Sequence, residues 1–237
     1  LIASVGFCLS PMPDAALSSP QESGEKRGAR SRGLLLCLVC IFLGSAAENI
    51  MTGWISSYME KALLIPKAVG DILGMAVFAL LLALTRSAYA KFGKNIEKTL
   101  LLGMAGAVLC YLAAGLSANA AIGFIACILT GICTSMLWPG TLILMEERVP
   151  SPGIAAYALM AAGGDLGAAF APQLIGIIID KATAYASTDA VFLSGATPEQ
   201  AGLRFGMLAA AVFPLLGTIW LMTAGKVFKR APDSAKR

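Results

Sequence analysis

The chain has 237 residues, of which 57% are hydrophobic and 14% charged, and its mean hydropathy is +0.77. This composition is too apolar for a water-facing globular surface and is typical of a membrane protein. The sequence contains no histidine and neither a GxSxG nor a Walker A motif, which excludes His-based catalysis and His-ligated metals. We therefore expect no catalytic residues, no metal and no cofactor, and an ordinary enzyme is not expected.

The chain begins with two short segments that do not span a membrane. Residues 1–9 are apolar but too short to cross a bilayer, so we interpret them as the end of a truncated preceding helix. A signal peptide is the alternative, because Ala15 and Ala16 resemble a cleavage region. Residues 10–33 are rich in proline, serine and basic residues, which predicts a disordered basic linker.

Residues 34–225 contain six long apolar runs, each of the roughly 20 residues that a membrane-spanning helix needs. The third and fourth runs are joined only through Ser117, Ala118 and Asn119, so we expect a tight helical hairpin there. Pro139 lies inside the fourth run and predicts a kink. The six predicted spans cover residues 34–59, 69–90, 99–117, 119–145, 153–179 and 203–225.

The basic residues predict the orientation of these spans. If residues 10–33 lie inside and six spans alternate, 14 of the 18 basic residues fall on the inner side, including those of a tail at 226–237. Cytoplasmic flanks are enriched in Lys and Arg. We therefore predict a multi-pass protein of the inner cell membrane with both ends in the cytoplasm. The net charge of +4 then requires no nucleic-acid partner.

Two carboxylates fall near the middle of predicted spans, Glu48 in the first and Asp165 in the fifth. An ionisable group in hydrocarbon is costly unless it is paired, hydrated or neutralised, so each is a candidate functional group. No Lys or Arg occurs deep in a span, and Arg86 lies close to a predicted cytoplasmic end. We therefore expect neither carboxylate to have an internal salt bridge. A proton, a cation or an absent segment remains as partner, and a structural hydrogen bond to another helix is the alternative.

Other polar groups surround these carboxylates. Asn49 and Trp54 follow Glu48 in a stripe of small, polar and aromatic residues, which suits a polar solute. Trp54 could instead anchor the helix at the membrane interface. Trp138 precedes the predicted kink, and Gln173 lies two turns beyond Asp165, on a helix whose glycines and alanines allow close helix contact.

Two consecutive three-span blocks, each with a polar first or second helix, are the pattern of an inverted-repeat transporter half. The chain resembles the C-terminal six-helix half of a major facilitator superfamily transporter, over nearly all of residues 34–225. The resemblance implies an all-α membrane fold of two inverted three-helix repeats, with residues 10–33 as the loop between halves. It also implies a missing N-terminal six-helix half as partner.

Two local matches support this resemblance. The segment Arg86-Ser-Ala-Tyr-Ala-Lys-Phe-Gly93-Lys94 resembles the superfamily's Gly-x-x-x-Asp-Arg-x-Gly-Arg-Arg loop, although the acidic member is missing. Arg86, Gly93 and Lys94 are therefore candidate gating residues of a cytoplasmic loop. The segments around Glu48, Trp138 and Asp165 are similar to bacterial permeases of the fucose-permease type, which implies a small polar solute such as a sugar, moved with a proton.

The sequence thus predicts a secondary transporter of a small polar solute that works by alternating access. Glu48 is the first candidate for substrate or proton binding, because a partly desolvated carboxylate can carry a proton. Asp165 is the second, followed by Asn49, Trp54, Trp138 and Gln173. A half-size homodimeric transporter and a non-transporting membrane sensor or scaffold are the alternatives.

Overall fold

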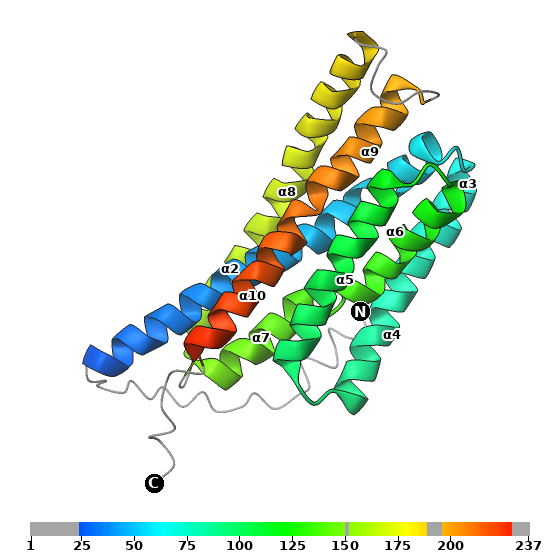
Figure 1. The fold of residues 1–237 in the computed structure, drawn as a ribbon. Coiled ribbons are helices and arrows are strands. Elements are labelled where there is room, and N and C mark those ends of the chain that lie inside the picture. The colour runs from blue at the N-terminus through cyan, green and yellow to red at the C-terminus, as the bar shows by residue number, and fades with distance from the viewer. Residues whose placement is uncertain (1–23, 150–151, 189–195, 229–237) are drawn as a thin grey trace, which may run out of the picture.

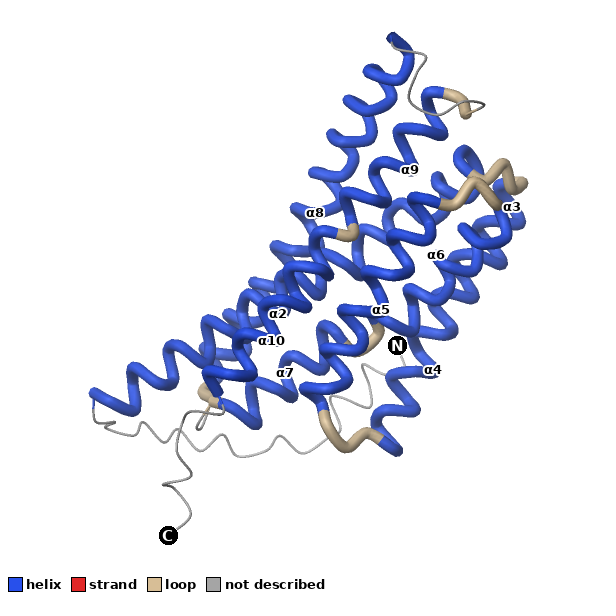
Figure 2. The backbone as a smooth tube through the Cα atoms, viewed as in Figure 1, coloured by secondary structure: helices blue, strands red, loops and turns tan. Residues whose placement is uncertain are grey.

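The computed structural model describes residues 24–149, 152–188 and 196–228, which form a bundle of helices without a strand among them. Figures 1 and 2 show the long helices lying side by side along an elongated molecule. Six helical stretches are long and apolar enough to cross a membrane, which makes the chain a multi-pass membrane protein and confirms the six predicted spans. They cover Arg32–Ala62, Lys67–Phe92, Ile96–Leu116, Ala120–Arg148, Ile154–Ser187 and Pro198–Thr223.

The first span consists of α2 (Gly24–Ser57) and the π-helical turn η1 (Tyr58–Ala62). The prediction of a disordered linker up to residue 33 is wrong for its last ten residues, because α2 already begins at Gly24. The prolines of this segment all precede residue 21. The first span can therefore extend toward the N-terminus as far as Gly24 without a proline in its helix. Residues 1–23 lie outside the described residues. The interpretation of residues 1–9 as the end of a preceding helix therefore stays a prediction.

The second span contains α3 (Lys67–Val69), the π-helical segment η2 (Gly70–Met75) and α4 (Ala76–Phe92). The π-helical segments η1 and η2 contact each other: Met59 packs on Gly74, where a Cβ atom would lie 2.1 Å from the Met59 sulfur. The Ser56 hydroxyl, at the end of α2, donates a hydrogen bond to the Asp71 carboxylate. Glycine therefore lets the first two spans approach closely at this end of the bundle.

The third span is α5 (Ile96–Leu116), and the fourth is divided into α6 (Ala120–Thr134) and α7 (Leu137–Arg148). The tight hairpin between α5 and α6 is confirmed, and the Asn119 side chain caps α6 by accepting from the Ala121 amide at 2.8 Å. The predicted interruption of the fourth span is also confirmed. It takes the form of a turn at residues 135–136, just before Pro139.

The fifth span is α8 (Ile154–Thr188), which extends nine residues beyond its predicted end and keeps Pro172 inside the helix. The sixth consists of α9 (Pro198–Ala210) and α10 (Val212–Phe228), separated at Ala211. It starts earlier than predicted because Thr197 and Gln200 form a capping box. The predicted basic tail at 226–237 lies outside the described residues beyond Phe228.

Helix α2 occupies the centre of the packing. It contacts α8, α7 and α10, and two buried apolar clusters lie along it. The hydroxyl of the fully buried Tyr111, on α5, donates to the Ala47 carbonyl at 2.6 Å. The buried Tyr58 hydroxyl donates in the same way from η1 to the Ala114 carbonyl of α5. These two bonds satisfy buried polar groups and tie α5 to the first span.

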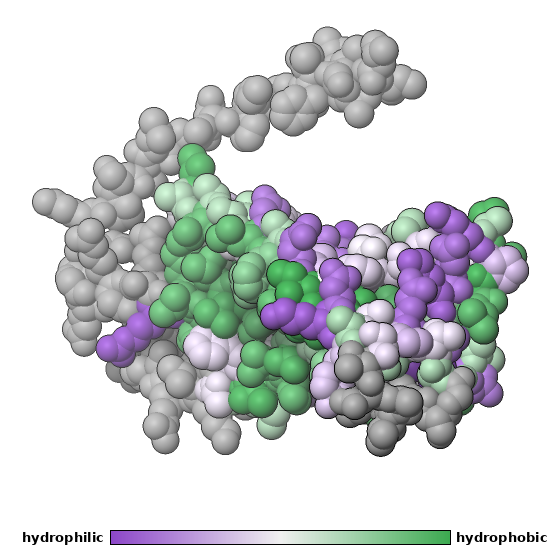
Figure 3. All heavy atoms as spheres, turned by 90° about the horizontal axis from the view of Figure 1, so that it is seen from above, coloured by the Kyte–Doolittle hydropathy of each residue, from purple (hydrophilic) through white to green (hydrophobic). Residues whose placement is uncertain are grey.

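Large apolar side chains also cover the outside of the bundle. On α5 the exposed residues Leu102, Leu109 and Leu116 recur at intervals of seven, which places them along one side of the helix. In the view from above, hydrophobic side chains gather on one flank and hydrophilic ones toward the middle and the other flank (Figure 3). An apolar flank of this kind is suited to lipid rather than water.

Candidate functional site

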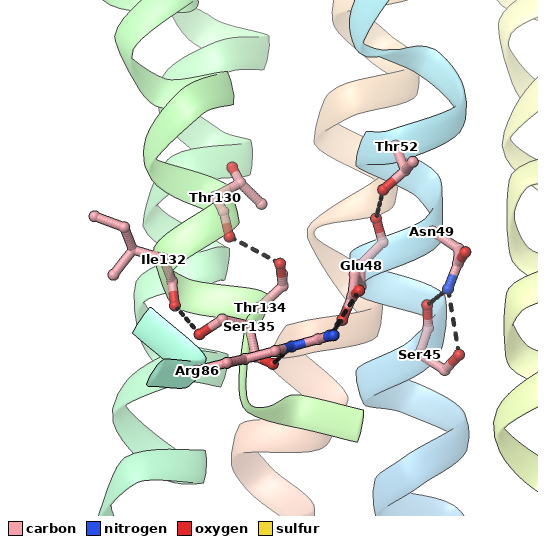
Figure 4. Close-up of polar contacts among 9 residues, drawn as sticks. All are labelled: Ser45, Glu48, Asn49, Thr52, Arg86, Thr130, Ile132, Thr134 and Ser135. Carbon is pink, nitrogen blue, oxygen red and sulfur yellow. Dashed lines mark hydrogen bonds and ion pairs between the residues drawn. The ribbon is translucent and has the colours of Figure 1, made fainter. Parts of the chain in front are cut away.

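A polar junction joins three spans near the middle of the first one. Arg86 of α4 extends toward α2, and its Nη2 donates to the two carboxylate oxygens of Glu48 at 3.1 and 3.3 Å (Figure 4). The Nε of the same guanidinium donates to the backbone carbonyl of Ser135 at 2.8 Å, at the turn between α6 and α7. One arginine therefore connects α2, α4 and the interrupted fourth span.

The Ser135 carbonyl is free to accept this bond because of Pro139. In a continuous helix the amide of residue 139 would donate to the carbonyl of residue 135, and proline has no amide hydrogen. Ser135 is itself buried, at 1% exposure, so its carbonyl needs a partner. Arg86 supplies that partner, so the interruption of the fourth span provides one of the two groups that Arg86 binds.

The expectation that Glu48 has no internal salt bridge is wrong. Arg86 lies six residues before the end of α4, about 9 Å along the axis. The length of its side chain, however, allows the guanidinium to reach a group deeper than its own Cα. The depth of a residue in its span is thus not the depth of its charge when the side chain is as long as that of arginine.

The pair is only partly shielded from its surroundings. The Glu48 side chain is 18% exposed, and the Arg86 side chain 40%. Removing either partner from a shielded ion pair leaves an uncompensated charge, which costs about 3–5 kcal/mol when the pair is fully buried. Because the guanidinium is partly exposed, this cost is lower for the Glu48–Arg86 pair. The exposed part of the guanidinium is accessible to a small molecule.

Two threonine hydroxyl groups lie on the last turns of α6, just before the junction. Thr130 and Thr134 are fully buried, and the Thr130 hydroxyl donates to the Ala126 carbonyl at 2.9 Å. The Thr134 hydroxyl donates to the Thr130 carbonyl, also at 2.9 Å (Figure 4). Such bonds locally compete with the helix ladder and favour bending. They therefore support the interruption that Pro139 begins.

The polar side chains next to Glu48 on α2, the predicted Asn49 and also Thr52, bond within their own helix. The Asn49 amide donates to the Ser45 carbonyl at 2.9 Å and to its hydroxyl oxygen at 3.3 Å. Thr52 donates to the Glu48 carbonyl at 3.0 Å and is exposed. Asn49 thus contributes a polar surface next to Glu48 without contacting its carboxylate in the described chain.

The two predicted tryptophans contact α8. The Trp54 indole donates to the Pro172 carbonyl at 3.2 Å, which joins α2 to α8. Trp138 packs against Gly164, where a Cβ atom would lie 2.3 Å from the Trp138 Nε1. Trp54 also lines a hollow between the end of the first span, α8 and α9, whose polar lining includes Asp180, Thr183 and the Lys61–Glu199 ion pair at 2.7 Å.

Asp165 and Gln173 lie apart from the Glu48–Arg86 pair. Both are exposed on α8 and form no hydrogen bond or ion pair with any described residue. Gly167 of α8 lies against the Phe42 backbone of α2. Asp165, two residues before Gly167, therefore lies on the exposed side of α8 rather than on the side that contacts α2. The sequence predicts one site with two carboxylates, and the structure brings Arg86, rather than Asp165, to Glu48.

The predicted loop residues divide between a helix and a loop. Arg86 lies inside α4, whereas Gly93 and the exposed Lys94 lie between α4 and α5. The Gly93 amide donates to the Tyr89 carbonyl at 2.7 Å, and a Cβ atom there would lie 2.5 Å from that oxygen. Gly93 is thus required by the close turn at the end of α4.

Ser135 was not among the predicted residues, because it contributes a backbone carbonyl rather than its side chain. Pro139 was the available signal, since a proline inside a helix identifies the carbonyl four residues earlier as free. Among the described residues, no three Cys, Asp or Glu side chains are grouped so that they could hold a metal. The arrangement is suited to charge exchange and proton binding.

Comparison of the chain with models of known protein families finds no match, and comparison with curated proteins finds no relative either.

Proposed function

We propose that the chain is a six-helix half of a major facilitator-type transporter, built from two inverted three-helix repeats, that moves a small polar solute together with a proton. The observation that carries the proposal is the Glu48–Arg86 pair, an ion pair in the middle of an apolar bundle with a partly exposed guanidinium. Intramembrane ionisable groups of this kind are costly and mark pathways for ions and substrates. Glu48 would bind the proton, and Arg86 would hold Glu48 while the site is empty.

The helix interruptions support the same proposal. Transporter sites are commonly formed where a spanning helix is broken, because the freed backbone groups line a cavity. The Ser135 carbonyl is such a group, and it belongs to the same junction as Glu48. Close contacts through Gly163 and Gly167 let α2 and α8 pack tightly within the bundle.

The test is uptake by the protein expressed from its full gene and reconstituted into liposomes, with radiolabelled sugars and carboxylates and an entrapped pH indicator. We expect solute uptake that acidifies the liposome interior. Glu48→Gln should abolish the proton movement, because an amide cannot carry a proton. Glu147→Gln, an exposed carboxylate at the end of α7, is the matched control and should leave uptake unchanged. If no solute is taken up above protein-free liposomes, the proposal is wrong.

A membrane scaffold is the second candidate, because the Glu48–Arg86 pair also satisfies both of its members without a ligand. In a scaffold, the double variant E48Q/R86Q should keep all function, since both charges disappear together. In a transporter the same double variant should fold but lose proton-coupled uptake. Parallel measurement of melting temperature and uptake on this variant separates the two.

A further inference from the structure

The guanidinium of Arg86 has unused bonding capacity. Its Nε and Nη2 are bonded to Ser135 and Glu48, while no described residue accepts a hydrogen bond from its Nη1. The side chain is 40% exposed, against 18% for Glu48. A guanidinium offers five donors in a fixed planar arrangement that matches a carboxylate. The exposed part of Arg86 is therefore shaped to receive a second carboxylate.

Charge balance decides what can bind there. In the empty site one negative charge on Glu48 and one positive charge on Arg86 cancel, and no other described basic side chain pairs with Glu48. A second anion would add an unbalanced negative charge in a low-dielectric region. The guanidinium does not give up its proton, so protonation of Glu48 restores neutrality without a further ion.

We infer that the solute is a small monocarboxylate, which replaces Glu48 on Arg86 while one proton binds to the Glu48 carboxylate; this inference rests on the proposed function. In the exchange the Arg86–Glu48 hydrogen bonds break and equivalent bonds form between Arg86 and the solute. The proton from solution binds to a Glu48 oxygen, and the net charge of the site stays zero. A sugar has no charge with which to displace Glu48, so it would leave the pair intact.

Other titratable groups face this part of α2. Tyr111 lies on α5 with its hydroxyl bonded to the Ala47 carbonyl, and the thiols of Cys40 and Cys127 are buried nearby in the two clusters. The carboxylate of Asp165 is on the neighbouring helix α8 and is exposed. None of them bonds to Arg86 in the described chain. The proton that accompanies the anion is therefore assigned to Glu48.

The first experiment measures binding to the full protein in lipid nanodiscs by titration calorimetry. The probes are lactate and its uncharged amide analogue, lactamide. In buffers of different ionisation enthalpy, lactate should bind with uptake of one proton, and lactamide should not bind. Where Glu48 is ionised in the empty site, lactate affinity should fall tenfold per pH unit. This measurement needs no variant, so it does not depend on a mutant that folds. Equal binding of lactamide, or lactate binding without proton uptake, would overturn the inference.

The variants assign the two charges. Arg86→Gln should weaken lactate binding by more than tenfold, whereas Lys91→Gln, an exposed cation on the same helix, should not. Glu48→Gln should bind lactate without proton uptake and with the same affinity at pH 6 and pH 8, because the amide keeps the position permanently neutral. Full lactate affinity in Arg86→Gln would overturn the inference.

Uptake into liposomes separates this inference from the proposed function. Lactate and a proton together carry no net charge, so an imposed potassium diffusion potential with valinomycin should leave lactate uptake unchanged after subtraction of protein-free liposomes. A neutral sugar moved with a proton would respond to that potential. If L-fucose enters in a potential-dependent manner and lactate does not, the carboxylate inference is wrong while the transporter proposal stands. If neither enters, the transporter proposal fails and the inference fails with it.

Discussion

The Glu48–Arg86 pair shows how much a single side chain depends on its partner. Both carboxylate oxygens of Glu48 are within hydrogen-bond distance of one guanidinium nitrogen, and the guanidinium is fixed from the other side by the Ser135 carbonyl. Replacing one charge leaves the other uncompensated, whereas replacing both removes the problem. The stability of single and double variants therefore measures the pair without any knowledge of the solute.

We predict that Glu48→Gln and Arg86→Gln each lower the melting temperature in detergent, by a loss of about 1–3 kcal/mol, less than for a fully shielded pair because Arg86 is 40% exposed. The double variant E48Q/R86Q should melt closer to the unmodified protein than either single variant. Additive losses in the double variant would contradict a coupled pair.

Close glycine contacts provide a second prediction at the scale of a residue. A Cβ atom at Gly167 would lie 2.3 Å from the Phe42 carbonyl oxygen, whereas one at Gly53 would lie 3.8 Å from the Pro172 side chain. Both glycines lie between α2 and α8. Gly167→Ala should push the helices apart and cost about 1–3 kcal/mol, whereas Gly53→Ala should be neutral or slightly stabilising. Thermal melting of the two variants checks this, and equal effects would argue against the close packing.

The fourth span shows what a broken helix contributes as an element. Its two parts, α6 and α7, meet at a turn whose free carbonyl binds a side chain from another span. A straight helix in the same place would satisfy that carbonyl internally and leave Arg86 with one partner fewer. The break is thus part of the site and not only a bend in the chain.

We predict that Pro139→Ala makes the fourth span more continuous. The new amide at position 139 can donate to the Ser135 carbonyl in competition with Arg86. Hydrogen exchange measured by mass spectrometry should show increased protection of peptides covering residues 135–140, and proton-coupled uptake should fall. Pro172→Ala is the control, because α8 is already continuous through Pro172. Unchanged exchange at 135–140 would mean that the turn is maintained without the proline.

At the scale of the whole molecule, six spans place the two described ends of the bundle on one side of the membrane. The loop that contains Lys94 then lies on the same side as these ends, and the hairpin that contains Asn119 lies on the opposite side. The distribution of basic residues favours the cytoplasm for the Lys94 side.

We predict that a protease site inserted after Lys94 is cut in inside-out vesicles and protected in sealed right-side-out cells. A site inserted after Asn119 should show the reverse. The insertions lie in loops between helices, where they disturb no buried contact. Cleavage of both sites from the same side would exclude the six-span topology, and a consistent reversal would invert the orientation.

The sequence by itself determined the class of the protein and the number of its spans. In lipid a long apolar run can satisfy its backbone hydrogen bonds within itself only as a helix. The six spans therefore follow from composition and length alone. Short links and prolines are equally local signals, which explains why the α5–α6 hairpin and the break near Pro139 were predicted. Glu48 was identified for a related reason, since a carboxylate in an apolar run is visible in the sequence itself.

Only the tertiary structure decided which groups meet at the site. Glu48 and Arg86 are 38 residues apart, and neither helix periodicity nor span boundaries fix which way a long side chain extends. The packing of α2 and α8 turns Gly163 and Gly167 of α8 toward α2 and leaves Asp165 on the exposed side. The Ser135 carbonyl became a ligand through a proline on its own helix and an arginine on another. Partner choice depends on packing between helices, and packing is a property of the assembled bundle rather than of any one segment.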